Sequence, residues 1–233
     1  MSTNTIVKIS ITALFAVNII IWAFVFKDSE PSGVDSASIV NSTELQSEVK
    51  IGNQVWMTKN LDLDRFSNGD LIKEVRSAAE WVEALKNEQP AFCYYNDDRT
   101  YDKKYGKLYN WYAVTDKRKL APKGWHIPSE NEWNVLTDFL GGGIIAGEKL
   151  SCTPEQEKEV NEGLNSGFSA LPSGYRTLLG TSEQVGSCGY WWSASLDKSG
   201  LPFAVDIDFS RFYMLNKSFS SKGSGLSVRC LRD

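Results

Sequence analysis

The chain opens with an apolar segment that differs from everything after it. Residues 9–26 contain no charged side chain and lie between Lys8 and Lys27. A helix rises about 1.5 Å per residue, so this segment comes close to spanning a hydrocarbon core about 30 Å thick. No amphipathic stripe selects one face for burial, which argues against a core helix. The pattern predicts a transmembrane helix over residues 9–26, with residues 1–8 in the cytoplasm.

This apolar segment is either an uncleaved signal anchor or a signal peptide. A cleavable signal peptide has small residues just after its apolar region. Here the segment ends in the bulky run 22–26, and no cysteine follows that a lipid could modify, so the anchor is favoured. Both alternatives place the remainder outside the cytoplasm, in the periplasm or at the cell surface. Residues 27–48 are polar, and Pro31 and Gly33 break any periodicity, which predicts a linker.

From residue 49 onward, short apolar runs alternate with turn signals. Residues 49–57 carry apolar side chains on both sides of a Gly-Asn pair, which predicts a β-hairpin. Two helix starts have the sequence Ser-x-x-Glu, at Ser77 and at Ser129. In this capping box the serine accepts from the backbone while the glutamate reaches back. Helical apolar spacing follows each start, and Gly141 is a stop signal for the second helix.

The part of the chain after Phe168 is expected to be mainly β, with Gly, Ser and Pro between short apolar runs. The predicted strands cover residues 190–194, 203–209, 212–215 and 226–231. Residues 109–114 fit either a short helix or a strand. Helices followed by a run of strands predict an α+β domain over residues 49–233.

Charge and histidine content exclude several kinds of site. The formal net charge is −4 and no basic stripe is present, so a nucleic-acid partner is not expected. His126 is the single histidine, so a multi-histidine metal centre cannot form, and a Ser-His-Asp arrangement would have to use this residue. No serine or cysteine partner motif accompanies it. We expect the His126 ring to pack at a helix entrance and bond nearby backbone, and we predict no catalytic residue and no cofactor.

Two acidic pairs suit either calcium or ordinary surface roles. Ca²⁺ takes about six to eight oxygen ligands, which carboxylates supply. Asp97 and Asp98 also fit a turn, while Asp206 and Asp208 also fit the solvated face of a strand. These simpler roles need no ion, so no metal site is predicted.

Aromatic residues are the main candidates for ligand contacts. The chain contains 8 Trp, 9 Tyr and 11 Phe, and Trp and Tyr suit both cores and ligand faces. On the predicted strand 190–194, Trp191 and Trp192 point to opposite faces. One of them would then fill the core while the other meets a loop or solvent. The candidate ligand-binding residues are Tyr190, Trp191, Trp192, Arg211 and Tyr213.

Seven short motifs occur in one order and together resemble a known family. The motifs are residues 49–61 (VKIGNQVWMTKNL), 91–97 (AFCYYND), 105–114 (YGKLYNWYAV), 120–133 (LAPKGWHIPSENEW), 166–176 (SGFSALPSGYR), 189–193 (GYWWS) and 227–233 (SVRCLRD). They resemble the Fibrobacter succinogenes major paralogous domain family, common in exported Fibrobacter and Bacteroidota proteins, over residues 49–233. The resemblance implies a C-type-lectin-like fold, with two helices flanking a small twisted antiparallel sheet, long loops and neighbouring termini. It implies no activity, and a fold alone does not supply one.

Four cysteines are present, Cys93, Cys152, Cys188 and Cys230, and no C-x-x-C pair occurs. This spacing argues against a zinc ribbon or a thioredoxin-like centre. From the residues alone, an oxidising compartment allows three pairings, and a cytosolic location leaves free thiols. Members of the family often carry Cys where Ala121 stands. The resemblance therefore implies that Cys93 pairs with Cys230, as the family-like set, and that Cys152 pairs with Cys188.

The expected function is a non-catalytic binding or adhesion module, tethered to the membrane through residues 9–26. Its partner would be a glycan or a protein of the cell envelope. The alternative is a structural or assembly subunit of an envelope complex: exposed Trp in a groove favours binding, and a flat apolar patch favours assembly. A third alternative is an enzyme of the formylglycine-generating type, because those enzymes share the implied fold and a helix start resembling residues 128–133. The closely placed cysteine pair of that enzyme type is missing.

Overall fold

The computed structural model describes residues 47–151, 166–210 and 213–233. They belong to the unit Leu45–Asp233. The predicted transmembrane segment 9–26 and nearly all of the linker 27–48 lie outside the described residues. Within the described part of the chain, no helix is long and apolar enough to cross a membrane.

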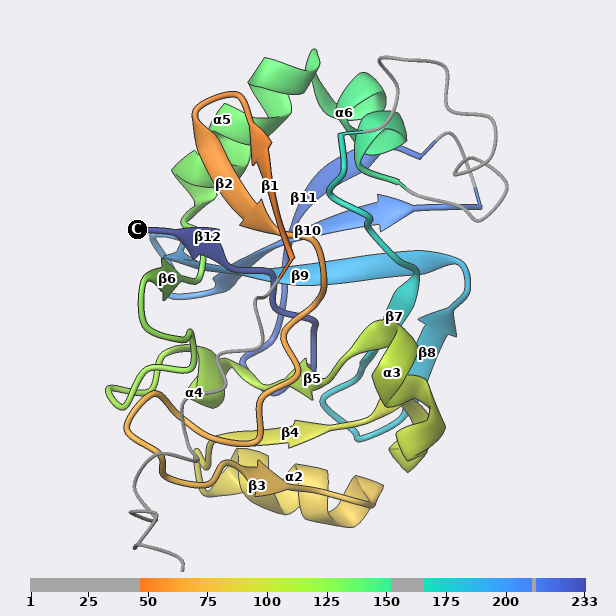
Figure 1. Cartoon of the computed structure of the whole chain (residues 1–233). Helices are drawn as coiled ribbons and strands as arrows, with labels where there is room; N and C mark the ends of the chain where they lie inside the picture. Colours follow the sequence, from red (N-terminus) through yellow and green to blue (C-terminus); the bar gives the residue numbers. More distant parts are fainter. Residues whose placement is uncertain (1–46, 152–165, 211–212) are drawn as a thin grey trace, which may run out of the picture. The chain divides into compact units, whose positions relative to one another are not determined.

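A four-stranded sheet joins the two ends of the domain. Its strands, in spatial order, are β1 (Glu48–Ile51), β2 (Gln54–Met57), β12 (Leu231–Arg232) and β6 (Trp125–His126). The β1–β2 hairpin is confirmed, and Gly52 in its turn has a φ of 61°, which favours glycine. Leu231 pairs with Trp56. The end of the chain therefore lies beside the first hairpin (Figure 1).

A five-stranded sheet forms the middle of the domain. Its strands, in spatial order, are β11 (Leu215–Phe219), β10 (Pro202–Asp208), β9 (Cys188–Leu196), β7 (Ser173–Arg176) and β8 (Ser182–Val185). The predicted strand 190–194 lies in β9, and the predicted strand 203–209 matches β10 except for its last residue. The predicted strand 212–215 is wrong: Tyr213 has a φ of 48°, a left-handed conformation that interrupts extended backbone, and β11 begins only at Leu215.

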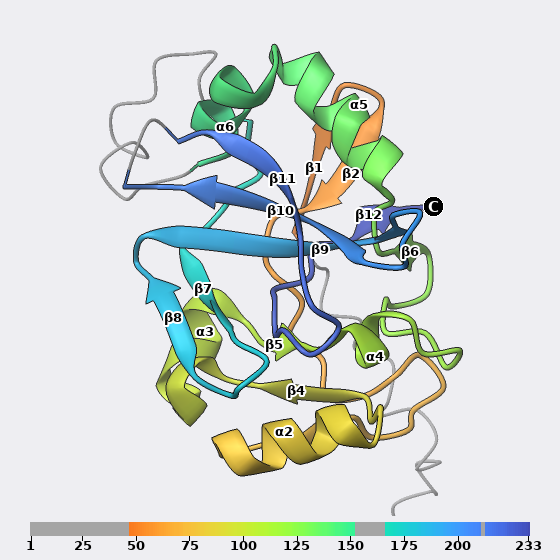
Figure 2. The ribbon, with the colours of Figure 1, turned by 180° about the vertical axis from the view of Figure 1, so that it is seen from behind.

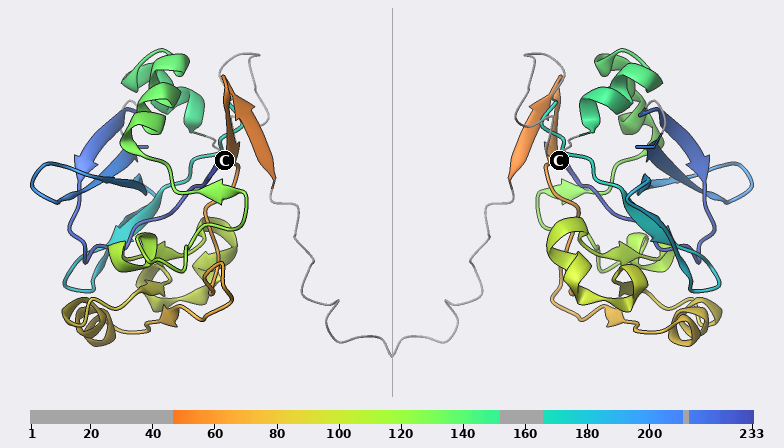
Figure 3. Two further views of the ribbon diagram at one scale, coloured as in Figure 1. Left: turned by 90° about the vertical axis from the view of Figure 1, so that its left-hand side faces the viewer. Right: turned by 90° about the vertical axis from the view of Figure 1, so that its right-hand side faces the viewer.

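A three-stranded sheet and five α-helices complete the described residues. The sheet contains β3 (Lys73–Glu74), β4 (Ala91–Cys93) and β5 (Leu108–Tyr109). The helices are α2 (Ala78–Lys86), α3 (Asp102–Tyr105), α4 (Trp111–Val114), α5 (Glu130–Leu140) and α6 (Gly143–Leu150), with short 3-10 helices at Tyr95–Asp97 and Arg99–Tyr101. Helix α2 lies at one end of the domain, and α5 and α6 lie at the other (Figures 1, 2 and 3).

Both predicted helix starts are present. The Ser129 hydroxyl accepts from the Glu132 backbone N–H, and the Glu132 carboxylate accepts from the Ser129 backbone N–H, which completes the capping box of α5. Gly141 ends this helix in a left-handed conformation with a φ of 108°. At α2, Ser77 caps the Glu80 N–H, but the Glu80 carboxylate reaches one residue further back than predicted, to the backbone of Arg76.

The mixed helix and sheet class is confirmed, but the arrangement differs from one antiparallel sheet flanked by two helices. The described residues form three sheets, and the pairs β3–β4 and β7–β9 are parallel. Strands β3 and β5 have two residues each, too few to show alternation. Helix α6 follows Gly142, which supplies no side-chain cap. The ambiguous segment 109–114 divides between β5 and α4 because the Asn110 side chain caps α4.

The core lies on both faces of the central strands. Trp191 and Val205 belong to one buried cluster, whereas Trp192 and Ala204 belong to another. The alternation of side chains along a strand separates the two clusters. A third cluster surrounds Trp81.

Five of the seven motifs meet at one buried polar centre around Asn60, because the carbonyls of Tyr105 and Phe168 also accept from Asn60 and Arg229. Its Oδ1 atom accepts from Trp191 Nε1 at 2.8 Å and from Arg229 Nη2 at 2.7 Å. Arg229 is fully buried, and it also donates to the backbone carbonyl of Met57 at 3.1 Å. Burial lowers the pKa of Arg229 to about 9. Because buried polar groups are costly without partners, this centre fixes how the first hairpin, β9 and the final segment fit together.

Candidate functional site

The face of β10 and β11 that carries Val205 is covered at one end and open at the other. The cross-strand pair Ile207–Leu215 is buried in the cluster to which α5 and α6 contribute. Four positions further along each strand, the pair Phe203–Phe219 faces the same side, with Phe219 55% exposed. The centroids of these two phenyl rings are 4.5 Å apart. We call this pair the aromatic platform.

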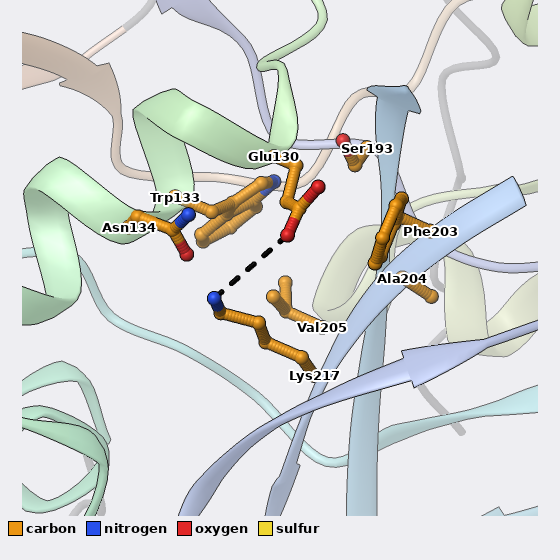
Figure 4. Close-up of a pocket in the computed structure, with 8 residues that line it drawn as sticks. All are labelled: Glu130, Trp133, Asn134, Ser193, Phe203, Ala204, Val205 and Lys217. Atoms are coloured by element: carbon orange, nitrogen blue, oxygen red, sulfur yellow. Dashed lines mark ion pairs between the residues drawn. The ribbon is translucent and has the colours of Figure 1, made fainter. Parts of the chain in front are cut away.

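A hollow lies between the first turns of α5 and the middle of β10 and β11 (Figure 4). Its volume is about 190 Å³ when the open solvent at its mouth is included. Its lining residues are Glu130, Trp133, Asn134, Ser193, Phe203, Ala204, Val205 and Lys217. The space left between the side chains holds about one water molecule. The hollow therefore admits one substituent of a ligand rather than a whole molecule.

Two buried polar atoms of the hollow lack protein partners. Trp133 is 2% exposed, and its Nε1–H has no hydrogen-bond partner among the described residues. The buried Oδ1 atom of Asn134 likewise has none there. An unpaired buried polar group costs about 1–3 kcal/mol. Both atoms are thus buried in the wall of the hollow rather than exposed to its open space.

An ion pair crosses the hollow from α5 to β11. Glu130 Oε1 and Lys217 Nζ are 3.8 Å apart, and both side chains are at least one-third exposed (Figure 4). Exposed pairs of this kind contribute about 0–1 kcal/mol. The backbone N–H of Glu130 donates to Ser195 at 2.9 Å, which fixes the start of α5 to the end of β9. Glu130 and Lys217 thus form an electrically neutral rim around the hollow, and these two charged side chains are easily rearranged.

The predicted ligand residues lie elsewhere. Trp191 and Trp192 are both 0% exposed, so the expectation that one of them meets a loop or solvent is wrong. The reason is that β9 lies between two core clusters. Tyr190 is half-buried and donates to Gln184. Tyr213 is half-buried with its ring edge-on to Phe209, and Arg211 lies outside the described residues.

The predicted disulfide between Cys93 and Cys230 is absent, because both are free thiols. They are buried in different clusters of the core. Burial raises the pKa of each thiol to about 12, which makes them unreactive. Cys188 is also free and half-buried, while Cys152 lies outside the described residues.

The acidic pairs have protein partners. Asp97 pairs with Arg176, whose side chain is fully buried, and Asp98 caps the 3-10 helix that follows it. Asp206 and Asp208 accept from polar side chains near them. Over the described ranges, no group of at least three His, Cys, Asp or Glu residues is placed to hold a metal ion.

His126 contacts carboxylates rather than the backbone expected from the sequence. Its Nδ1 atom is 2.8 Å from Asp233 Oδ1, and its Nε2 atom is 2.9 Å from Glu132 Oε1. Burial opposes protonation, but these two hydrogen bonds outweigh it and raise the pKa of His126. The two carboxylates therefore stabilise the charged form of the ring, which connects the end of the chain with α5.

A second charged cluster surrounds the Lys107 ammonium. This group pairs with Asp62 and lies 5.1 Å from the centre of the Phe92 ring. Burial, together with the nearby Asp62 carboxylate, raises the pKa of Asp102 to about 6. Asp102 Oδ1 is buried without a partner among the described residues. In this cluster Lys107 balances the charge of Asp62, whereas the ionised form of Asp102 is unfavourable.

The family model of the Fibrobacter succinogenes major domain matches residues 49–232. The chain belongs to this family. The matched range takes in the hollow, the aromatic platform and the polar centre around Asn60. No curated protein and no solved structure matches the chain.

The residues of the hollow in this Fibrobacter succinogenes major domain were missed from the sequence. Trp133 follows a capping box and fits the helical apolar spacing after Ser129, which gives no sign of a hollow. Phe203 and Phe219 are sixteen positions apart and meet only through the β10–β11 register. One signal was available, because Phe203 begins a predicted strand whose alternation places it on the same face as Val205.

Proposed function

We propose that this chain is a non-catalytic binding module that recognises a glycan at the hollow beside Trp133. The observation that carries the proposal is the exposed aromatic platform at the edge of the hollow. Ligand sites combine apolar and aromatic surfaces with a few placed polar groups. A sugar presents an apolar ring face for the platform and hydroxyl groups for the exposed Glu130 and Lys217 side chains at the rim.

The dimensions of the site favour an extended ligand. The hollow has room for a single substituent, and the platform lies at its edge, so most of the ligand would rest outside on Phe203 and Phe219. A sugar within or at the end of a longer glycan can place one substituent in the hollow while the rest of the glycan lies on the platform. The neutral Glu130–Lys217 rim favours an uncharged ligand over a strongly charged one.

We further propose a C-type-lectin-like fold for residues 49–233 and a location outside the cytoplasm. The fold proposal is supported by the family, by the two serine-capped helices α2 and α5, and by the pairing of β12 with β2, which brings the ends of the domain together. The location is supported by the uncharged segment 9–26, proposed as the membrane anchor. An experimental structure and protease accessibility in intact cells test these two proposals.

The function is tested by probing a glycan array with the full-length protein kept soluble by a mild detergent. Phe219→Ala removes an exposed half of the platform, and Phe139→Ala is the matched control, because Phe139 is 62% exposed on α5. We expect Phe219→Ala to weaken binding about tenfold, while Phe139→Ala binds as the unmodified protein does. Absence of binding by folded protein, or equal loss in the two variants, would contradict the proposal.

A second candidate function is assembly with an envelope protein. The observation that favours it is the exposure of three large apolar side chains, Phe139, Ile144 and Ile145, on α5 and α6. Such residues are enriched where proteins associate. Crosslinking in membranes tests this candidate: Phe139→Ala would reduce the crosslinked species, and Phe219→Ala would not.

A further inference from the structure

We infer that the substituent at the mouth of the hollow is one free hydroxyl group bound jointly by Glu130 and Lys217, so that the glycan is a neutral polymer without acetyl or carboxylate groups on the bound sugar. This inference rests on the proposed function and narrows it to one class of ligand. It follows from the size of the hollow, from the spacing of the two charged groups and from their place beside the aromatic platform.

The size of the hollow limits what it can accept. The space between its lining side chains holds about one water molecule, and a hydroxyl group is close to water in size. An acetamido group, an acetyl ester or a carboxylate brings several non-hydrogen atoms and is too large. The unpaired polar atoms of Trp133 and Asn134 are buried in the wall, so the ligand makes its hydrogen bonds at the rim.

The two charged groups at the rim are spaced for one bridging hydroxyl (Figure 4). Lys217 Nζ and Glu130 Oε1 lie 3.8 Å apart, beyond the range of about 2.7–3.2 Å for a direct hydrogen bond. A hydroxyl oxygen carries one donor and two acceptor sites. One hydroxyl can therefore donate to Glu130 while it accepts from Lys217. An amide carries these functions on two different atoms, a carboxylate only accepts and an ammonium only donates.

The charged pair and the aromatic platform lie on one surface. Lys217 and Phe219 are alternate residues of β11, so they point to the same face, about 7 Å apart along the strand. Phe203 pairs with Phe219 and also lines the hollow. The hydrogen bond from the Glu130 backbone N–H to Ser195 holds the other side of the rim in place. A sugar ring resting on Phe219 can thus extend one hydroxyl to the pair.

The charges at the rim disfavour acidic and amino sugars. A carboxylate beside Lys217 also meets Glu130, and an ammonium beside Glu130 also meets Lys217, so each charged substituent meets a like charge as well as an opposite one. A hydroxyl adds no charge, and its hydrogen bonds to the two ionised groups are about twice as strong as bonds between neutral groups. The rim therefore selects against charged sugars, and the size of the hollow selects against acetylated ones.

An array of unbranched glycans, probed with the full-length protein in a mild detergent, tests the inference. It carries neutral polymers of glucose, mannose or xylose beside polymers of N-acetylglucosamine, glucosamine or galacturonic acid. We expect at least one neutral polymer to bind about tenfold more tightly than each of the other three. Glu130→Gln and Lys217→Met, which keep side-chain size and remove the charge, should each weaken that binding about tenfold. The double variant should bind about as weakly as either single variant, because each change breaks the same bridge.

Matched controls remove the same charges elsewhere. Glu148→Gln on α6 and Lys86→Met on α2 change exposed residues outside the lining of the hollow. Both control variants should bind as the unmodified protein does. Urea unfolding of all the variants should show that they are folded, because the Glu130–Lys217 pair is exposed and contributes little to stability.

The outcomes separate this inference from the proposed function, which Phe219→Ala tests independently. Four results overturn the inference and leave glycan binding standing: equal binding of neutral and N-acetylated or acidic polymers, unchanged binding in both folded single variants, losses that add in the double variant, or equal losses in the controls. Additive losses would mean that Glu130 and Lys217 contact different atoms of the ligand. No binding to any glycan by folded protein overturns both proposals.

Discussion

The Nε2 atom of His126 lies 2.9 Å from the Oε1 atom of Glu132, the glutamate that completes the capping box of α5. The other carboxylate oxygen of Glu132 accepts from the Ser129 backbone N–H at 2.7 Å. On its opposite side the imidazole contacts Asp233 at 2.8 Å. One ring thus connects the start of α5 with the end of the sheet that holds both ends of the domain.

This arrangement predicts a pH-dependent contribution to stability. The pKa of His126 is raised above its ordinary value of 6.5, so the folded state binds this proton more tightly than the unfolded state does. The stabilisation is fully present below about pH 6.5 and is lost as the pH rises through the folded pKa. We expect His126→Gln to lower the free energy of unfolding by up to about 1 kcal/mol at about pH 6, a limit set by solvent screening of half-exposed groups.

Urea unfolding of both proteins at about pH 6 and about pH 9 measures this effect. The difference between them should shrink at the higher pH, where the histidine of the unmodified protein is neutral. Asp233→Asn, which removes one of the two carboxylates, should reproduce part of the loss at the lower pH. An equal loss at both values would show that His126 acts through packing rather than charge.

For Asp102 the expected effect of substitution has the opposite sign to that for His126. Its pKa is raised from 3.8 to about 6, so its contribution to stability is present below about pH 3.8 and is lost as the pH rises through about 6. At neutral pH the ionised group is therefore unfavourable in the folded state. We expect Asp102→Asn to raise the free energy of unfolding at about pH 7 by roughly 1 kcal/mol, discounted for partial exposure.

Chemical denaturation at about pH 4 and about pH 7 tests the sign of this effect. The exposed Asp64, whose side chain is 61% accessible, provides the matched control, and Asp64→Asn should change stability by less than about 0.5 kcal/mol. A loss of stability in Asp102→Asn at neutral pH would mean that the attraction between Asp102 and Lys107 outweighs burial.

The polar centre around Asn60 predicts a large effect from a small change. Asn60→Ala leaves Trp191 Nε1 and the buried Arg229 guanidinium without the oxygen that they share. Breaking a buried charged network costs about 3–5 kcal/mol. Asn68→Ala, in an exposed turn, is the comparison and should cost below about 1 kcal/mol. Urea unfolding of the two variants compares them, and similar small losses would show that water readily replaces the Asn60 amide.

Local signals in the sequence were enough to predict the elements whose determinants are adjacent in the chain. The hairpin 48–57 depends on its Gly-Asn turn, and α5 depends on Ser129, Glu132 and Gly141 within one short segment. Strand β11 was misplaced because its start is set by the conformation of Tyr213, which no sequence pattern announces. The parallel pairs β3–β4 and β7–β9 join segments far apart in the chain.

The candidate site could not be predicted for a related reason. Trp191 and Trp192 were plausible ligand contacts because one face of a strand is often solvated. In the structure both faces of β9 are covered, and Trp192 Nε1 donates to the Tyr109 carbonyl inside the core. The exposed aromatic surface instead forms at Phe219, where the cover contributed by α5 and α6 ends. Such a boundary depends on tertiary packing rather than on residue type.

The cysteines provide a test of the core arrangement. Cys93 and Cys230 are buried in separate clusters with pKa values raised to about 12, whereas Cys188 is half-buried. Thiolates are the reactive form, so we expect a maleimide to leave Cys93 and Cys230 unlabelled in folded protein and to reach Cys188 before either of them. Unfolding without reductant should then expose both buried thiols, with each labelled peptide detected by mass spectrometry. If Cys93 and Cys230 are labelled only after a reductant is added, they are paired, and the disulfide implied by the family resemblance exists after all.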